Sequence, residues 1–332
     1  IADRFGALAQ EEKNMNDLAM KRVKRLTRLQ RFSPIAIFLA LFIIMTIVSP
    51  TFLQRASVMN LLKQCAVYGI LAIGETFVIM TGGIDLSVSA VCGFTGCFVS
   101  YLNANAGMSA GVAILLGLIV ALVVGLINGV LTAIVDIPDF IATLGTQTIL
   151  SGLALLITGG LSITGISKTI TVVGGKSGFG IGFPFASLTF LIILLIAWFL
   201  QEKTTLGRNI LAIGGNKEAA RVSGVRIVAT KIIACVLSAI FSAIGGMVLI
   251  GRLNSANALM GGGYELDAIT AAVIGGASLS GGKGSVFGSF IGILVVGILT
   301  NGLDLMNVSS YYQQIIKGAI ILLAVLADRK KE

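Results

Sequence analysis

Long apolar runs alternate with short polar stretches along most of this chain. A membrane-spanning helix needs about 20 apolar residues. Ten runs approach or reach that length, at residues 34–53, 65–80, 87–103, 110–135, 140–158, 184–200, 231–251, 265–280, 285–303 and 312–327. The runs are continuous, whereas the strands of a membrane β-barrel alternate apolar and polar residues. The pattern therefore predicts an all-α polytopic membrane protein with about ten transmembrane helices.

The polar segments between these runs divide the chain into parts. Residues 1–33 form a polar N-terminal tail without the apolar core of a signal peptide, and residues 34–327 form the transmembrane domain. A polar loop interrupts this domain at 201–231, and a short C-terminal tail covers 328–332. We expect both tails and the 201–231 loop to lie in the cytoplasm.

Charge supports that orientation. With the N-terminus inside, eighteen of the 24 Lys and Arg residues fall on the cytoplasmic side and five on the outer side, while Lys317 lies within the last run. Cytoplasmic loops of membrane proteins carry such an excess. The net charge of +9 is therefore explained by topology and by contact with membrane lipid, and we expect no nucleic-acid partner.

Composition agrees with a membrane protein. Hydrophobic residues make up 56% of the 332 residues and charged residues only 12%. Soluble domains have roughly 45–50% apolar and about 25% charged residues.

Several kinds of chemistry are excluded by residue type. The chain has no histidine, and its four cysteines lie in apolar runs without the spacing of a metal site, so we expect no metal. "ITVVGGKSG" and "GGASLSGGKGS" lack the complete glycine, lysine and hydroxyl pattern of a phosphate-binding loop. The chain is therefore not expected to be an enzyme or to bind a cofactor itself.

Two glycine-rich sequences end apolar runs, "GGIDLS" at 82–87 and "GGASLS" at 275–280. Irregular backbone at membrane depth is tolerated where it is buried in protein or lines a water-filled cavity. The likeness between them is either an internal repeat or chance in a chain rich in these residue types. Candidates for a translocation pathway or gate are Glu75, Gly82, Gly83, Asp85, Ser87, Gly275, Gly276 and Ser278.

Two acidic residues of this set allow alternative roles. Asp85 either lines the pathway or caps a helix, since Asp is a favoured N-cap residue. Glu75 lies within an apolar run, where a charge is costly. It either couples transport to protons or bonds to a neighbouring helix.

A second polar group follows the run at 231–251. Arg252, Tyr264, Glu265 and Asp267 are placed by the topology at the outer mouth. They suit a docking protein or a polar solute, and the alternative is an ordinary solvated loop.

The cytoplasmic loop contains a short helix signal, "AIGGNKEAARVSGV" at 212–225. Asn216 suits the N-cap, Glu218 and Arg221 suit the two ends of the helix dipole, and Gly224 can end the helix in the left-handed conformation. Ala219 and Ala220 add a small apolar patch. About two turns are marginal alone in water, so the helix needs a brace, either its own bundle or a partner's cleft.

"EAARVSG" resembles the EAA-xxx-G motif of ABC importer permeases, which meets the ATP-hydrolysing subunit. Further stretches resemble the branch of that family that imports ribose, xylose, arabinose and galactose. These stretches, within 34–329, are "LGRNILAIGGNKEAARVSGV", "VIMTGGIDLSV", "INGVL", "FIATLGT", "YELDAITAAVIGGASLSGGKGSVFGSFIG" and "SSYYQQIIKGAIILLAVLAD". The chain departs from many members at Asp139, which separates Pro138 from "FIATL", and at Glu75.

The resemblance implies the ABC importer permease fold and three partners. These are a second permease copy in a homodimer, a cytoplasmic ATPase that holds ATP and Mg and is often a fused tandem chain, and an extracytoplasmic sugar-binding protein. It also implies a bacterial inner membrane location. Residues 216–224 then carry the ATPase-coupling role, which involves Asn216, Glu218, Ala219, Ala220, Arg221 and Gly224.

The expected function is that of a permease for an ATP-driven sugar importer, with ribose as the expected sugar. Three alternatives stay open. The same family imports another pentose, galactose, a signalling sugar or a nucleoside. An ion-coupled secondary transporter would use Glu75 and Asp85 instead, and a passive channel would need no partner for the 201–231 loop.

Overall fold

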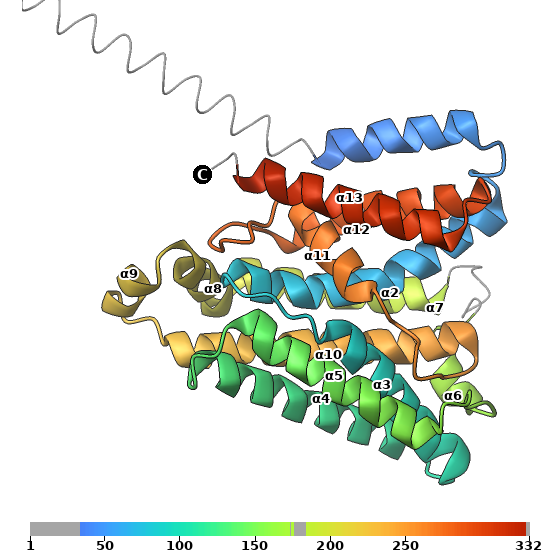
Figure 1. Cartoon of the computed structure of the whole chain (residues 1–332), viewed down its shortest axis with the longest axis horizontal. Helices are drawn as coiled ribbons and strands as arrows, with labels where there is room; N and C mark the ends of the chain where they lie inside the picture. The colour runs from blue at the N-terminus through green and yellow to red at the C-terminus, as the bar shows by residue number, and fades with distance from the viewer. Residues whose placement is uncertain (1–33, 173, 176–183, 330–332) are drawn as a thin grey trace, which may run out of the picture.

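The computed structural model describes residues 34–172, 174–175 and 184–329, and this part of the chain contains helices and loops without a β-strand (Figure 1). The predicted tail at 1–33 and most of that at 328–332 lie outside it. The helices are Pro34–Val48, α2 (Arg55–Met80), α3 (Val88–Ser100), the π-helix η1 (Tyr101–Asn105), α4 (Ala110–Ala133), α5 (Asp139–Thr158), α6 (Lys168–Thr171), α7 (Phe185–Lys203), α8 (Thr205–Gly215), α9 (Lys217–Val222), α10 (Ile227–Leu253), α11 (Tyr264–Ile274), α12 (Val286–Leu305) and α13 (Ser310–Arg329).

Six of the described helices are long and apolar enough to cross a membrane: α2, α4, α5, α7, α10 and α12. The all-α multi-span expectation is confirmed, but ten full spans are not found among the described residues. The predicted spans at 87–103 and 265–280 become α3 and α11, with 13 and 11 residues. α3 continues directly into the five-residue η1, and at about 1.5 Å per residue neither this joined helix nor α11 reaches across a hydrocarbon core about 30 Å thick. Glycine-rich turns shorten both helices.

Two helices form the centre of the molecule. α2, α10 and α12 have 61%, 67% and 61% of their most apolar stretches buried, against 28% for α4 and 22% for α5, and of these three α2 and α10 pack against the most other helices. α10 packs against α2, α3 and α4, and α2 also packs against α7, α11 and α12. In Figure 1, α12 and α13 lie on one side of this centre and α4 and α5 on the other.

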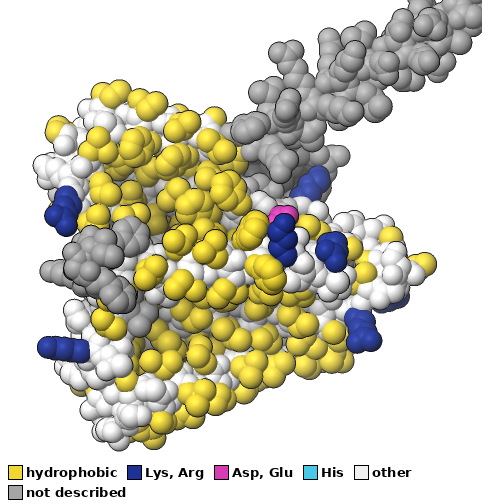
Figure 2. All heavy atoms as spheres, turned by 180° about the vertical axis from the view of Figure 1, so that it is seen from behind, with side chains coloured by type: hydrophobic (Ala, Val, Ile, Leu, Met, Phe, Trp, Pro, Cys, Tyr) yellow, Lys and Arg dark blue, Asp and Glu magenta, His cyan; other side chains and the backbone are white. Residues whose placement is uncertain are grey.

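The outer helices present apolar side chains to their surroundings. Leu115, Ile149, Leu156, Leu195 and Phe199 on α4, α5 and α7 are all exposed. Figure 2 shows a broad hydrophobic face, with Lys and Arg side chains towards its left and right edges. A continuous apolar face of this kind is what lipid chains solvate, so the surface agrees with a membrane protein.

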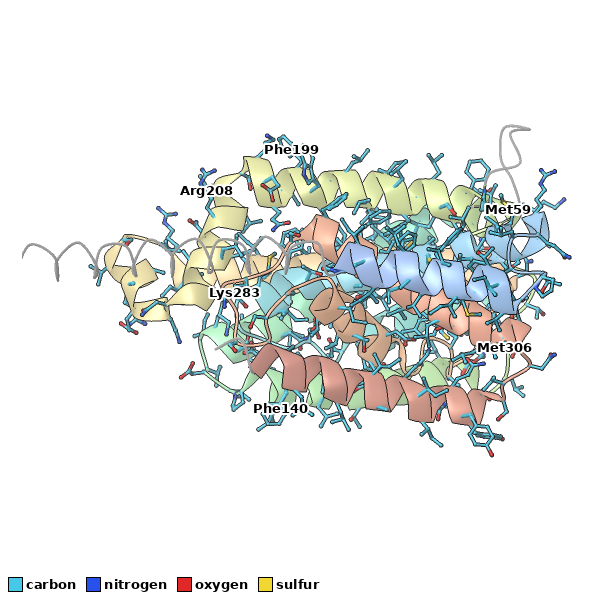
Figure 3. The ribbon with its side chains drawn as sticks, turned by 90° about the horizontal axis from the view of Figure 1, so that it is seen from above. Met59, Phe140, Phe199, Arg208, Lys283 and Met306 are labelled. Carbon is cyan, nitrogen blue, oxygen red and sulfur yellow. The ribbon has the colours of Figure 1, made fainter. Side chains whose placement is uncertain are left out.

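One end of the bundle carries the short helices of the 201–231 loop. Figure 3 places Arg208 of α8 and Lys283 of the α11–α12 loop at this end, and Met59 and Met306 at the other. α8 and α9 project beyond the ends of α2 and α10 (Figure 1). The 201–231 loop therefore shares an end of the molecule with the second glycine-rich loop.

Candidate functional site

The first glycine-rich loop, residues 82–87, is buried between α2 and α3 and is held by Asp85. One carboxylate oxygen of Asp85 accepts hydrogen bonds from Ser87 N at 2.9 Å and Ser87 Oγ at 2.5 Å. The other accepts from Ser238 Oγ of α10 at 2.9 Å. Ser87, not Asp85, occupies the N-cap position of α3. Asp85 therefore folds the turn before the helix and ties it to α10.

Glu75 of α2 also forms a hydrogen bond to the first glycine-rich loop. It is 0% exposed, and its Oε1 accepts a hydrogen bond from the backbone N–H of Asp85 at 3.0 Å. Its Oε2 is buried with no hydrogen-bond partner. Glu75 thus satisfies a backbone group of the loop that follows its own helix, and not of a neighbouring helix, while its free oxygen leaves one unused acceptor.

Residues that the sequence analysis missed complete this network. Asn128 of α4 donates to Ser87 Oγ at 2.9 Å and accepts from Thr146 of α5 at 2.6 Å. Thr143 of α5 accepts from the backbone N–H of Leu86 at 3.1 Å. The sequence does contain a signal for such residues, a polar side chain inside an apolar run. Asn128 in "GLINGVL" is an example. The network joins the loop to α2, α4, α5 and α10.

The end of the second glycine-rich loop, residues 275–285, is bonded to Gln201 of α7. Gln201 donates to the carbonyl of Gly284 at 3.1 Å and accepts from the backbone N–H of Val286 at 2.7 Å. Ser285 caps α12 by accepting from Gly288 N at 2.9 Å. The sequence analysis missed Gln201, a polar residue that ends an apolar run.

Gly275, Gly276 and Ser278 lie around the start of this second loop. Gly275 packs on α12, where a Cβ atom would stand 2.4 Å from the carbonyl carbon of Gly288. Gly276 has a φ of +96°, which favours glycine. The backbone N–H of Ser278 donates to the carbonyl of Lys283 at 3.1 Å and closes the loop.

The two loops meet each other and the end of α8 through glycines. The backbone N–H of Gly282 donates to the carbonyl of Met80 at 3.0 Å. A Cβ on Gly281 would stand 2.8 Å from both Gly82 N and Gly214 Cα, and one on Gly214 would stand 2.2 Å from Gly282 N. We call Gly82, Gly214, Gly281 and Gly282 the glycine junction. Only glycine permits backbones to approach this closely.

Gly83 lies beside the junction and faces a different neighbour. A Cβ atom there would overlap a carboxylate oxygen of Asp139, whose other oxygen pairs with Lys231 of α10 at 3.2 Å. The ion pair is mostly buried, with side chains 17% and 16% exposed. Asp139, the residue that departs from the expected "PFIATL" pattern, thus joins α5 to α10 beside the first loop.

The short helix α9 has the ends that the sequence predicts. Asn216 caps it by accepting from Ala219 N at 2.9 Å. Glu218 and Arg221 pair on its surface at 3.2 Å, and Gly224 follows with a φ of +82°. An exposed pair of this kind contributes little stability, so the cap and the packing of α9 must hold it.

Of the two braces proposed for α9, the structure shows the chain's own bundle. Ala220, 4% exposed, packs inward with Ile213 and Ile227, whereas Val222 is 89% exposed and Ala219 is also exposed. Beside α9 lies a cleft of about 640 Å³ that reaches the end of α4. It is lined in part by Lys217, Arg221, Arg226 and Asp136. α9 thus rests on its own bundle through Ala220 and leaves its tip and a basic cleft open.

The residues expected at the outer mouth separate in the structure. Arg252 ends α10 and donates to Asn60 at 3.3 Å on the surface. Tyr264, Glu265 and Asp267 begin α11, which starts opposite the middle of α2, because residues 254–263 fold back against α3. A Cβ on Gly93 of α3 would stand 2.7 Å from the carbonyl of Met260. These three residues therefore lie deeper than the sequence predicted.

Comparison with known proteins gives consistent matches. Residues 57–325 match the family described as "Branched-chain amino acid transport system / permease component". A ribose import permease protein of Bacillus subtilis is 43% identical over 303 residues, with 91% of this chain and 94% of that one covered. A ribose import permease protein of Escherichia coli is 40% identical over 304 residues, with 89% and 92% covered. A galactose/methyl galactoside import permease protein of Salmonella typhimurium is 37% identical over 330 residues, covering 94% and 98%. No solved structure matches.

Proposed function

The chain belongs to the family described as "Branched-chain amino acid transport system / permease component". On that premise we propose that it is the membrane permease of an ATP-driven sugar importer. Ribose is the proposed sugar, because relatives named as ribose import permeases are 43% and 40% identical over most of both chains. The relative named for galactose and methyl galactoside, 37% identical, keeps another sugar as the alternative. The chain is a transport component and not an enzyme.

The glycine junction is the observation that carries the coupling part of this proposal. α9 continues from α8 through Asn216, and α8 ends at Gly214 and Gly215 against both glycine-rich loops. A backbone contact without side chains leaves no compressible layer between the elements. Force on α9 would therefore reach the ends of α2 and α11 directly.

The open side of α9 supports an ATPase as the source of that force. Val222 is exposed at the tip, and the cleft beside α9 has three basic side chains, Lys217, Arg221 and Arg226. An exposed apolar side chain next to a basic cleft suits a partner that supplies an apolar pocket and acidic side chains. ATP and Mg would bind to that partner.

The remaining assembly follows from the family. We place the chain in the bacterial inner membrane as one copy of a homodimer, served by an extracytoplasmic sugar-binding protein and an ATPase that is often a fused tandem chain. Both termini would lie in the cytoplasm, with α3 and α11 completing ten membrane segments. The binding protein would deliver the sugar near Arg252, the one docking candidate that lies on the surface at the outer end.

Glu75 supports one alternative function, an ion-coupled secondary transporter. Its Oε2 is buried and unpartnered, so a proton or cation could bind there. However, Glu75 and Asp85 are 0% and 1% exposed and serve as acceptors for the first loop. We therefore favour a structural role for both carboxylates.

Stimulated ATP hydrolysis tests the proposed coupling. The purified chain is combined with an ABC ATPase and a sugar-binding protein from the same organism, and phosphate release is measured in nanodiscs. We expect sugar-loaded binding protein to raise hydrolysis only when this chain is present. Equal hydrolysis with and without the chain would contradict the proposal.

A further inference from the structure

Aromatic and ionic side chains meet at the start of α11, away from both glycine-rich loops. The rings of Tyr68 and Tyr264 lie edge to face with centroids 4.6 Å apart. Lys317 Nζ of α13 pairs with Asp267 at 2.9 Å and lies 5.8 Å from the centre of the Tyr68 ring. Gln64 donates to the hydroxyl of Tyr68 at 3.2 Å. We call Gln64, Tyr68, Tyr264, Asp267 and Lys317 the aromatic–ionic cluster.

The cluster lies at the level of the bundle's middle. Tyr68 is near the centre of α2, and Lys317 lies in the outer half of α13, which begins at Ser310. Gln147, near the centre of α5, donates to Glu265 beside the cluster at 3.4 Å. Charged and amide side chains are rare at such depth and usually face a bundle interior or an aqueous path. Three helices other than α11 thus direct polar groups towards its first turn.

Two acceptors of this region have no partner. Gln64 is 6% exposed, and its Oε1 has no hydrogen bond. Oε2 of Glu265 is likewise buried and unpartnered. An unpaired buried acceptor costs about 1–3 kcal/mol. A structural ion pair explains Asp267 and Lys317, but it does not explain the open acceptors of Gln64 and Glu265.

The cluster is also next to the surface. Leu266 and Gly263 at the start of α11 are exposed, and Leu259 in the preceding loop is 82% exposed. On the inner side of Asp267 and Lys317 lies a cavity of about 20 Å³ that also touches Thr300, whose hydroxyl is unpartnered. That volume holds about one water molecule. A solute could thus reach the cluster from the exposed turn before α11. Beyond the cluster it would meet the polar groups that line the small cavity.

We propose that the aromatic–ionic cluster is the contact site for the sugar inside the permease, an inference that rests on the proposed function. Sites for small polar ligands combine aromatic walls with a few placed polar groups. The two rings contact each other and the adjoining cavity holds about one water, so a pentose enters only when the rings part, and they then pack against its C–H faces. The unpartnered oxygens of Gln64 and Glu265 accept its hydroxyl protons, while Lys317 donates to its oxygens. Because the direct hydrogen bonds are few, the affinity for the sugar is low. A transport pathway requires low affinity, since the sugar must leave the site again.

Labelling of an introduced cysteine tests the contact directly. The four native cysteines are buried, so they give little background. Tyr264→Cys is labelled with a small membrane-impermeant thiol reagent in the complete complex, with and without ribose at high concentration. Tyr312→Cys, at a position 65% exposed on α13, is the control. We expect ribose to slow labelling at position 264 severalfold and to leave position 312 unchanged, and sucrose to protect neither. Equal labelling of position 264 with and without ribose would overturn the proposal.

Uptake by Gln64→Leu gives a second, independent result. We expect vesicle uptake of ribose to fall about tenfold, the effect of losing about 1.4 kcal/mol of contact. The midpoint of thermal unfolding of the purified complex should stay near that of the wild type, which shows that the variant folds. Tyr312→Leu should change neither. Undiminished uptake by Gln64→Leu would count against the cluster, whereas failure of the wild-type complex to import any sugar would contradict the proposed function itself.

Discussion

Gly214 of α8 lies against Met80 at the end of α2, so close that a Cβ atom on Gly214 would stand 2.1 Å from the Met80 carbonyl oxygen. The two residues are far apart in sequence and come from different elements of the proposed mechanism. Met80 precedes the first glycine-rich loop, and Gly214 precedes the cap of α9. Their contact ties the end of α8 directly to the end of α2.

Gly214→Ala should weaken coupling because the added methyl group must push α8 away from Met80 and Gly282. Overpacking of this kind costs about 1–3 kcal/mol. We expect binding-protein-stimulated ATP hydrolysis to fall about tenfold or more, measured in nanodiscs with the complete complex.

Gly215→Ala is the matched control for that variant. The next glycine along the chain has no atom within 4 Å of an added Cβ. Hydrolysis and thermal unfolding of this variant should match those of the wild type. Equal loss in both variants would mean that the end of α8 needs flexibility and not close contact.

The exposed tip of α9 should matter to the partner and not to the fold. Val222→Asp places a charge on a side chain that is 89% exposed. We expect the midpoint of thermal unfolding to stay unchanged while the ATPase binds less tightly, by about tenfold or more, in a pull-down titration.

Ala220→Asp, in contrast to Val222→Asp, should first of all lower the stability of the protein. Ala220 is buried against Ile213 and Ile227, and an unpaired carboxylate there is costly to bury. Detergent-solubilised protein should unfold at a lower temperature even without the ATPase. A stable Ala220→Asp variant that loses only ATPase binding would place this residue at the interface instead.

Glu75 should act as a hydrogen-bond acceptor and not as a proton carrier. Glu75→Gln keeps an oxygen for the backbone N–H of Asp85, so ATP-driven uptake should stay within about threefold of the wild type. Glu75→Leu removes that acceptor and should destabilise the protein by about 1–3 kcal/mol in thermal unfolding. Complete loss of uptake in a stably folded Glu75→Gln variant would favour ion coupling.

The charges of Asp139 and Lys231 should stabilise the protein only when both are present. Lys231→Met leaves a mostly buried carboxylate without its cation and should destabilise the protein by about 3 kcal/mol. Adding Asp139→Asn should recover most of that loss. If the double variant is no more stable than Lys231→Met in thermal unfolding, the contact contributes nothing as a pair.

Local signals in the sequence predicted local structure well. Asn216 and Gly224 mark the ends of α9 because caps depend on residues within one turn. Apolar run length predicted the six long helices for the same reason. For Asp85 the sequence offered a pathway wall or a helix cap, and the structure gives the N-cap position of α3 to Ser87, to which Asp85 bonds.

Long-range relationships were beyond such reasoning. Nothing near Gly281 indicates that its neighbours are Gly82 and Gly214. The depth of Asp267 depends on residues 254–263 folding back along α3, which apolar run length does not reveal. Its partner Lys317 lies 50 positions further along the chain. Tertiary packing, and not propensity, decides these positions.

Labelled ribose uptake into vesicles is the most direct test of the central claim, that this chain moves sugar only when an ATPase drives it. The complete complex, enclosed ATP and external sugar-loaded binding protein should give uptake above the external concentration. The chain alone, under a proton or sodium gradient, should give none. Accumulation by the lone chain under either gradient would contradict the account.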